Sequence, residues 1–395
     1  MISFDDAVEL IRSIATPLGT ETVPIAEAAG RVLARRVTAE IDSPRADVSA
    51  MDGFAVREAD LRQFPASLQL VGASYPGSAW DGSVGPGTCV RIFTGAPVPE
   101  GADRVVIQED VRRDGDTVEI DGDPGDGRYI RERGSDFVQG EDLLPAGRVL
   151  DPRALVAAAA ADLAKLEVYR KPRLHILATG DELAEPGAAR ERPDAIPESV
   201  SLGVAALARA WGAECVDRDR VSDDLAAMEA LARAAIDGSD LVVVAGGASV
   251  GEKDFAKALF EPLGLQLVFS GVSIKPGKPA WLGRIAEKFV VGLPGNPTSA
   301  MVTARLFLAP LLAGLTGRPI NEGLGWMSLP LASSLGPCGS RETFHRARLV
   351  NGSAEVLAFQ ESSAQKALAN ADMLVRQPAQ SPALKAGTKI QVLHF

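Results

Sequence analysis

Two lysines, Lys275 and Lys278, stand three residues apart in the stretch SIKPGKPAWL, residues 273–282. A proline follows each of them directly, and proline stiffens the backbone because its ring fixes φ. A lone lysine in a loop is most often a solvated surface charge, but two like charges on a stiffened backbone suit an oxyanion. The stretch therefore predicts an anion-binding loop.

Carboxylates at the ends of predicted strands form a second chemical group. Asp181 and Glu182 follow the apolar run RLHILATG, and Asp254 belongs to the glycine-rich stretch GGASVGEKDF. Carboxylate oxygens are hard ligands of the kind that Mg²⁺ prefers. These residues predict a magnesium-assisted site, although each carboxylate alone is also compatible with a solvated loop.

The stretch GLPGNPTS, residues 292–299, places two prolines and a glycine where a buried strand stops and a helix begins. These residues force a sharp exit, so that backbone N–H groups and the hydroxyls of Thr298 and Ser299 converge at a helix N-terminus. Such a terminus binds anions. A plain connection with a Thr or Ser cap is an equally compatible alternative.

The elements that must position these loops lie between residues 172 and 318, where short apolar runs alternate with helical periods. Helices are expected near residues 199–212, 224–236 and 255–263 and from about 298. This alternation predicts a parallel, doubly wound sheet, whose ligands bind outside the carboxyl ends of the strands. The loops expected at those ends are 178–183, 246–255 and 292–299.

The regions on both sides of this part have different patterns. A helix is expected to begin after Ser3 and to end before Pro17. Residues 54–150 contain short β-branched runs cut by Gly, Pro and Asp, which predicts a β-rich region. The stretch 151–169 is expected to be one helix, capped by an aspartate with proline at its first position. From residue 319 onward, alternating strands predict a small β domain.

Charge and hydropathy exclude two classes of partner. The chain has 395 residues with 41 basic and 52 acidic side chains, and its net charge of −11 disfavours non-specific binding to nucleic acid or an anionic membrane. The longest apolar stretches are interrupted by Asp162 and by Arg305 with Pro310, so neither predicts a membrane span. Three cysteines without close spacing, and a start without a signal-peptide pattern, predict a cytoplasmic protein.

Several common catalytic motifs are also excluded. Gly246 and Gly251 have the spacing of a P-loop, but Glu252 and Lys253 stand where Lys and Ser or Thr are required. Three histidines are too few and too scattered for a histidine metal site or an evident triad. His175, within an apolar run, is expected to be a satisfied core residue.

Eight short stretches, taken in chain order, carry a family resemblance. They are MDGFA, TGAPVPEGAD, IRERGSD, ATGDEL, GGASVGEKDF, KPGKP, GLPGNPTS and SRETFHRARL. Each is weakly specific alone, but eight in order are highly specific. The chain is thereby similar to the molybdopterin molybdenumtransferase family, which includes the MoeA proteins and the gephyrin E domain.

The resemblance implies an activity in the synthesis of molybdenum cofactor. Members of this family cleave adenylylated molybdopterin in a Mg²⁺-dependent step and insert molybdenum from molybdate into the dithiolene. The resemblance further implies a homodimer, and contacts with the molybdopterin adenylyltransferase and with apo-molybdoenzymes. Such a reaction needs no nucleophilic side chain, because a molybdate oxygen or water can attack the phosphoanhydride phosphorus.

The fold implied by the resemblance is elongated, α/β plus β, with four domains. The first is an N-terminal linking and dimerisation domain, made of residues 1–20 with 41–52 and 132–170, and the second is a β-rich domain of residues 21–40 with 53–131. The third is a molybdopterin-binding α/β domain of residues 171–318 with a doubly wound, mostly parallel sheet. The fourth is a C-terminal β domain of residues 319–395.

The resemblance also implies site residues, position by position. The acidic, metal-associated part would comprise Asp52, Thr94, Asp136, Glu182, Asp223 and Asp254, with Asp52, Asp136 and Glu182 as metal ligands. The part that binds molybdate and substrate would comprise Ser249, Lys275, Lys278, Pro279, Pro294, Pro297, Ser299, Arg341 and Ser362. Which carboxylates touch the metal stays open.

Three departures from the family pattern leave an alternative open. Glu198 and Val200 stand where the family has a shorter polar residue and an Asn, Glu361 and Ser363 replace glycines, and Asp372 replaces an Asn. The alternative function is a non-catalytic carrier of molybdopterin or finished cofactor. A scaffold function is disfavoured, because the chain shows no long linker or fused domain.

Overall fold

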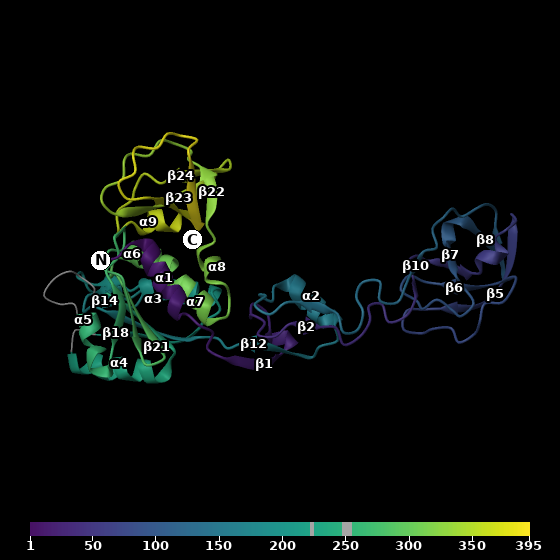
Figure 1. The fold of residues 1–395 in the computed structure, drawn as a ribbon, viewed down its shortest axis with the longest axis horizontal. Helices are drawn as coiled ribbons and strands as arrows, with labels where there is room; N and C mark the ends of the chain where they lie inside the picture. The colour runs from purple at the N-terminus through teal and green to yellow at the C-terminus, as the bar shows by residue number, and fades with distance from the viewer. Residues whose placement is uncertain (222–224, 247–254) are drawn as a thin grey trace.

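The computed structural model describes residues 1–221, 225–246 and 255–395. Figure 1 shows an elongated molecule in which a central α/β domain and a C-terminal β domain lie side by side at one end. A β-rich domain lies at the far end, and a narrow linking domain joins the two ends. The multidomain fold predicted from the sequence is confirmed.

The central domain is built on a six-stranded, mostly parallel sheet. Its first four strands are parallel neighbours and its last two pair antiparallel. This confirms the predicted doubly wound sheet, with an antiparallel edge in addition. In spatial order the strands are β16 (Glu214–Val221), β13 (Arg173–Thr179), β17 (Leu241–Ala245), β21 (Lys288–Leu293), β20 (Trp281–Ile285) and β18 (Gln266–Ser270).

Helices cover both faces of this sheet. Alternate residues of β17 enter opposite cores: Val243 packs on the side of α3 (Val200–Ala210), and Val244 on the side of α4 (Leu225–Gly238). Burial on both faces explains the continuous apolar strand sequences. The second side also carries a short helix and a 3-10 turn, α5 (Phe255–Ala258) and η5 (Glu261–Leu263).

A long apolar helix completes the first core. It runs from Pro297 to Leu315 as α6 (Pro297–Thr303), a π-helical turn and α7 (Ala309–Leu315). By length and composition this helix could cross a membrane, but 94% of its most apolar 18-residue window is buried inside the protein. Its apolar character is therefore explained by packing within the central domain, against the sheet and α8 (Ile320–Leu324).

The N-terminal helix α1 (Phe4–Ile14) forms where it was expected, behind a capping box made by Ser3 and Asp6. Its apolar face is part of the central core, and the Phe4 ring lies 5.0 Å from that of Phe344 in the C-terminal domain. The structure thus places the first residues with the central and C-terminal domains, whereas the sequence division placed them in the linking domain.

The linking domain takes residues 21–40, which the sequence division had placed in the β-rich domain. β1 (Thr20–Pro24) pairs antiparallel with β12 (Lys165–Tyr169), and Leu33 packs against α2 (Pro152–Ala160) in one core. A two-stranded ladder of β2 (Val37–Thr38) and β11 (Asp142–Leu144) closes this domain. The division of residues 1–40 between domains therefore differs from the one predicted.

The helix expected over residues 151–169 is only half that length. Asp151 caps it through a 2.8 Å bond from the Ala154 N–H, and it ends at Ala160. Asp162 then adopts φ +66, and residues 165–169 alternate in burial as the strand β12. The sequence interpretation missed this change because the period-2 pattern of KLEVY is short.

The β-rich domain holds a six-stranded sheet with a core on each face. The chain enters this domain through β3 (Val48–Ser49) and leaves it through β10 (Ile130–Arg131), and these two strands pair with each other. In spatial order the strands of the sheet are β7 (Arg104–Ile107), β4 (Gly53–Val56), β6 (Thr88–Ile92), β5 (Ala66–Ser74), β9 (Thr117–Ile120) and β8 (Val111–Asp114).

The C-terminal sheet includes a strand that belongs in sequence to the central domain. This strand, β19 (Ile274–Lys275), pairs parallel with β23, so that Lys275 lies opposite Thr343. The lysine loop, residues 275–279, is thereby held between the two domains. In spatial order the sheet is β19, β23 (Glu342–Val350), β25 (Met373–Gln377), β26 (Lys389–His394) and β22 (Met327–Pro330), with β24 (Ser353–Val356) paired to β23.

Candidate functional site

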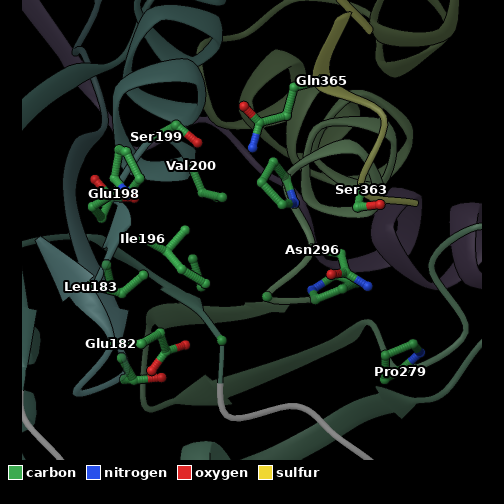
Figure 2. A pocket seen from close by; sticks show the side chains of 18 residues that line it. Glu182, Leu183, Ile196, Glu198, Ser199, Val200, Pro279, Asn296, Ser363 and Gln365 are labelled. Atoms are coloured by element: carbon green, nitrogen blue, oxygen red, sulfur yellow. The ribbon is translucent and has the colours of Figure 1, made fainter. Parts of the chain in front are cut away.

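A cavity of about 730 Å³ opens at the carboxyl ends of the parallel strands, and we call it the strand-end cavity. Thr179 ends β13, Gly246 follows β17 and Pro294 follows β21 at its floor. Figure 2 shows Glu182 and Leu183 on one side of the cavity and Pro279 and Ser363 on the other. The cavity therefore lies where a doubly wound sheet is expected to bind its ligand.

The turn between β21 and α6 explains the two prolines in GLPGNPTS. β21 ends at Leu293, the chain reverses over the next three residues, and α6 begins at Pro297, which has no N–H to leave unpaired. Thr298 and Ser299 are buried, and the Thr298 hydroxyl has no hydrogen-bond partner among the described residues. The turn thus directs a helix N-terminus and an unpaired hydroxyl to the cavity end of the sheet.

Thr179 carries a second buried hydroxyl at the same end of the sheet that has no hydrogen-bond partner in the described part of the chain. Gly246 has φ +98, and a Cβ there would lie 2.8 Å from the Thr179 Oγ1. Glycine is therefore required where β17 leaves the sheet, both for its backbone conformation and for space. Buried hydroxyls without partners are costly, and the Thr179 hydroxyl, which lines the cavity, is available to a ligand there.

The cationic residues predicted from the sequence do not line this cavity; they lie on, or contact, the loop whose last residue, Pro279, lines it. Lys275 is exposed on β19, and Arg341 donates from Nη1 to the Ile274 carbonyl at 3.4 Å. Lys278 is half-buried, and Pro279 lines the cavity. Lys275 and Arg341 are thus neighbours through the pairing of β19 with β23, where the C-terminal sheet takes up a strand of the central domain.

Ser362 and Ser299 complete the predicted oxyanion side. The Ser362 hydroxyl accepts a hydrogen bond from the Asn296 amide at 3.1 Å, which links the C-terminal domain to the turn before α6. Ser299 is 5% exposed in the first turn of α6. Pro294 and Pro297 line the cavity as predicted for a binding surface.

The conformation of the lysine loop depends on Gly277. Its φ is +107, and a Cβ there would lie 2.2 Å from the Cγ2 of Thr303, which is fully buried. We expect Gly277→Ala to lower the free energy of unfolding by about 1 to 3 kcal/mol in urea denaturation, through strain and overpacking. Gly387→Ala is the matched control, because Gly387 has φ +82 but open space around it. Equal losses for both variants would contradict a steric role for Thr303.

The pKa of His345 is affected by neighbouring cationic residues. Burial lowers the pKa of His345, and Arg346 and Lys275 lower it further, although the hydrogen bond with Gln377 opposes this. A histidine with a lowered pKa in the folded protein favours folding only in its neutral form. Its contribution to the free energy of unfolding is therefore fully present above the unfolded pKa of about 6.5, and it is lost as pH falls through the folded pKa.

This shift predicts a change in the pH dependence of stability. We expect the free energy of unfolding of His345→Gln to fall less between neutral pH and pH of about 5 than that of the wild type. His394→Gln, at an exposed histidine, is the control and should leave the wild-type slope unchanged. The measurement is urea denaturation at each pH, and an unchanged slope in His345→Gln would contradict the assignment.

The predicted acidic residues divide between two distant parts of the protomer. Asp52 accepts from both the N–H (2.7 Å) and the hydroxyl (2.8 Å) of Thr94, and these bonds lower its pKa. Both residues belong to the β-rich end, and Asp136 is exposed in the linking segment. Only Glu182 of the predicted metal ligands lines the strand-end cavity. One protomer therefore does not bring these carboxylates together.

Three further predicted site residues lie outside the described part of the chain. They are Asp223, Ser249 and Asp254. Their predicted roles stay predictions from the family resemblance.

Glu198 accounts for the first departure from the family pattern. Its carboxylate is buried and accepts from the backbone N–H (2.8 Å) and the hydroxyl (2.5 Å) of Ser201, and so it caps α3. Val200 is 7% exposed, packs in the central core and also lines the cavity. The first turn of α3 is therefore stabilised by Glu198, and an amide at position 200 is not required for that purpose.

The structure also shows the surroundings of Glu361 and Asp372, two further departures from the family pattern. Arg346 is fully buried, which lowers its pKa, and the carboxylate of Glu361 acts in the opposite direction. Glu361 thus lies near a buried positive charge, and its backbone carbonyl accepts a 3.2 Å hydrogen bond from Arg346 Nη2. Asp372 accepts a 2.9 Å hydrogen bond from the backbone N–H of Leu349 at the end of β23.

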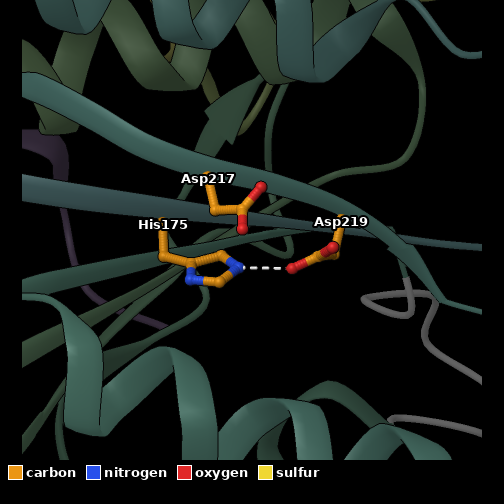
Figure 3. A group of neighbouring side chains, drawn as sticks. All are labelled: His175, Asp217 and Asp219. Atoms are coloured by element: carbon orange, nitrogen blue, oxygen red, sulfur yellow. Dashed lines mark hydrogen bonds and ion pairs between the residues drawn. The ribbon is translucent and has the colours of Figure 1, made fainter.

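His175 is buried in β13, and its Nε2 lies 2.6 Å from the Asp219 Oδ2 on β16. This confirms the predicted satisfied core residue. Figure 3 shows Asp217 beside the same pair, with one ligand atom of each residue within 4.8 Å of the others. The sequence analysis did not foresee this cluster, because strand pairing rather than sequence spacing brings the three residues together.

Several cavity residues are not among the predicted site residues, although Glu198 and Ser363 were noted as departures from the family pattern. Asn296, Ser363 and Gln365 line the cavity, the last from α9 (Gln365–Ala369), and so do Ile196 and Glu198 on the opposite side. Asn296 could have been found, because it stands between the two prolines of the turn. The short ladder of β14 (Leu183–Ala184) and β15 (Ile196–Pro197) carries Ile196 and gave no sequence signal.

Comparison with known families covers almost the whole chain. Residues 2–161 match the MoeA N-terminal region (domain I and II), residues 175–314 a probable molybdopterin binding domain, and residues 328–395 the MoeA C-terminal region (domain IV). The crystal structure of a molybdopterin biosynthesis MoeA protein from Pyrococcus horikoshii has a TM-score of 0.83 and 28% identity, and covers 100% of this chain and 99% of its own.

Named relatives agree with these matches. A molybdopterin molybdenumtransferase of Haemophilus influenzae is 37% identical over 320 residues, which cover 80% of this chain and 78% of the relative. Molybdopterin molybdenumtransferase 2 of Mycobacterium tuberculosis is 36% identical over 383 residues, with 94% of both chains covered. Since the family matches, the relatives and the fold agree along the whole length, the chain belongs to the molybdopterin molybdenumtransferase family.

Proposed function

We propose that the chain inserts molybdenum from molybdate into molybdopterin and releases the adenylate of an adenylylated molybdopterin substrate. The observation that carries the proposal is the strand-end cavity, which is lined by Pro279 at the end of the lysine loop, by Pro297 at the start of α6 and by Thr179, whose hydroxyl has no partner among the described residues. A cavity of about 730 Å³ is large enough for a pterin-sized ligand. The separate cationic edge suits a small dianion.

The side chains around the cavity suit two tasks. Lys275, Lys278 and Arg341 would hold molybdate by charge-assisted hydrogen bonds, and the Ser362 and Ser299 hydroxyls would orient it. Fixed donors at this edge stabilise charge where it develops on the attacked phosphate. No cysteine is needed as a nucleophile, and burial raises the pKa of the Cys89 thiol to about 12 and raises that of Cys215.

Magnesium is implied by the family, and the donor set fits it in part. Both hydrogen bonds from Thr94 end on the same carboxylate oxygen of Asp52, and they lower the pKa of this group, so that Asp52 is ionised at neutral pH. Asp136 and Glu182 are exposed carboxylates. These three hard-oxygen donors would hold Mg²⁺, which would supply charge compensation at the phosphates of the substrate.

The distance between these carboxylates within one protomer supports a homodimer. The β-rich end, with Asp52 and Thr94, lies far from the cavity that contains Glu182 (Figure 1). A second copy could bring its β-rich end to the cavity of the first, so that each site draws on both chains. We propose this composite arrangement, together with transient contacts to the molybdopterin adenylyltransferase and to apo-molybdoenzymes in the cytoplasm.

A second candidate function is a carrier that binds molybdopterin or finished cofactor without inserting metal. Its support is Val200, whose apolar side chain lines the cavity where the family has an amide. Because Glu198 caps α3, we expect Val200→Asn to change turnover by less than about tenfold, which corresponds to about 1.4 kcal/mol. The measurement is steady-state turnover. A gain larger than this would favour a carrier that has lost insertion.

Reconstitution of an apo-molybdoenzyme tests the proposed function. Purified protein is incubated with adenylylated molybdopterin, Mg²⁺ and molybdate, and then mixed with the apoenzyme. We expect activity of the apoenzyme to appear only when all three components are present. Activity that appears equally without molybdate would support transfer of preformed cofactor instead.

A further inference from the structure

A second cavity, of about 510 Å³, lies where the linking domain meets the central domain, and we call it the junction cavity. It shares no lining residue with the strand-end cavity. Four of its lining side chains are cations, against the single carboxylate of Glu214; the cations are Arg31, Lys171, Arg209 and Arg318. The lining of this cavity is therefore positively charged, whereas the protein as a whole has a net charge of −11.

Most of these cations are not neutralised by the protein. Arg31 is buried, forms an ion pair with Glu21 and donates to the Tyr169 carbonyl at 2.7 Å. Lys171, Arg209 and Arg318 form no ion pair with the residues that the structure describes. Like charges that share one cavity repel one another, and a bound anion removes that cost.

The guanidinium group of Arg318 is poorly hydrogen-bonded within the described structure. Its Nη2 makes only a long bond, 3.4 Å, to the Gly30 carbonyl, and its buried Nε has no hydrogen-bond partner in the described structure. Burial lowers the pKa of Arg318, so the site disfavours its charge as it stands. Gly212, with φ +85, has no side chain to cover this group, and a Cβ there would lie 3.9 Å from Nη2.

We propose that the junction cavity binds a phosphorylated small molecule, with a phosphate group against Arg318, Lys171 and Arg209. Guanidinium and ammonium groups match the oxygens of phosphate, and a volume of about 510 Å³ is in the range of small-ligand sites. Gly30 and Arg31 come from the linking domain, and Arg209 and Arg318 from the central domain. A ligand there contacts both domains and stabilises their junction.

Isothermal titration with pyrophosphate and with inorganic phosphate tests the proposal. The protein carries Lys275→Ala and Lys278→Ala, which removes two cations of the proposed molybdate side, and the junction-cavity substitutions then separate the two sites, because they leave every residue of the strand-end cavity in place. Lys171→Gln with Arg209→Gln removes two exposed, unpaired cations of the junction cavity. Arg62→Gln with Lys385→Gln removes the same charge from exposed positions elsewhere and is the matched control.

We expect one pyrophosphate to bind per chain, more tightly than phosphate, and at least about tenfold more weakly after the cavity substitutions. The control substitutions should leave the dissociation constant unchanged. Absence of binding at millimolar pyrophosphate, or equal weakening in both double variants, would overturn the proposal. Molybdate is titrated in the same way, and tighter binding of molybdate than of either phosphate would also overturn it, because the site would then select the metal oxyanion.

Discussion

Replacing Lys275 and Lys278 together with alanine should reduce molybdate-dependent turnover by at least about a thousandfold, because each fixed donor to a developing charge contributes about a hundredfold or more. Both side chains project from a loop whose backbone is set by Pro276, Gly277 and the pairing of β19 with β23. The substitutions therefore remove charge without removing a core contact. The measurement is AMP release at saturating adenylylated molybdopterin with varied molybdate.

The fold is checked by circular dichroism and by the urea midpoint. Lys385→Ala with Lys389→Ala removes two exposed lysines elsewhere in the C-terminal domain and is the matched control. It should retain wild-type turnover. Wild-type molybdate dependence in the Lys275 and Lys278 double variant, with a normal urea midpoint, would show that the oxyanion binds elsewhere.

Mixing two inactive variants should restore activity if each site is shared between two chains. Asp52→Ala and Glu182→Ala remove carboxylates that lie at opposite ends of one protomer. In a mixed dimer, the intact Asp52 of one chain would meet the intact Glu182 of the other at one of the two sites. After subunit exchange at equal amounts, we expect about a quarter of the wild-type rate, since about half of the dimers are mixed.

Each variant alone is the control and should be at least about a hundredfold slower than the wild type. Light scattering of the mixture should give the mass of a dimer. A dimeric mass without recovery of activity would indicate that each site is built from one chain. A monomeric mass at micromolar concentration would contradict the shared site directly.

The parts of the fold that the sequence predicts well are those with a strong local signal. The apolar runs of β13, β17 and β21 alternate with helical periods, and the sheet forms in the expected arrangement. The capping box at Ser3 and the proline after Asp151 locate two helix starts correctly. Such signals are local because they depend on backbone hydrogen bonding within a few residues.

The parts that the sequence does not predict depend on contacts between distant segments. Nothing in residues 21–40 indicates that β1 pairs with β12, about 140 residues later in the chain. The lysine loop joins the C-terminal sheet through β19, a strand of only two residues. The role of Glu198 becomes visible only with the geometry of α3, because an exposed loop glutamate and a helix cap have the same sequence.

The candidate site shows the same division. Lys275, Lys278 and the turn before α6 stand beside prolines and glycines that mark them in the sequence, and the structure places both Pro279, after Lys278, and the turn at the strand-end cavity. The sequence does not predict that the hydroxyls of Thr179 and Thr298 lack a hydrogen-bond partner among the described residues, because burial and the lack of a partner are properties of the folded chain.

Molybdate-dependent AMP release by the wild-type protein tests the central claim most directly. Purified protein is given adenylylated molybdopterin and Mg²⁺, and AMP is measured by chromatography with and without molybdate over several turnovers. The account predicts repeated release of AMP that requires molybdate and is accompanied by molybdenum bound to the pterin product. Tight binding of molybdopterin without molybdate-dependent AMP release would contradict it and would identify the protein as a carrier.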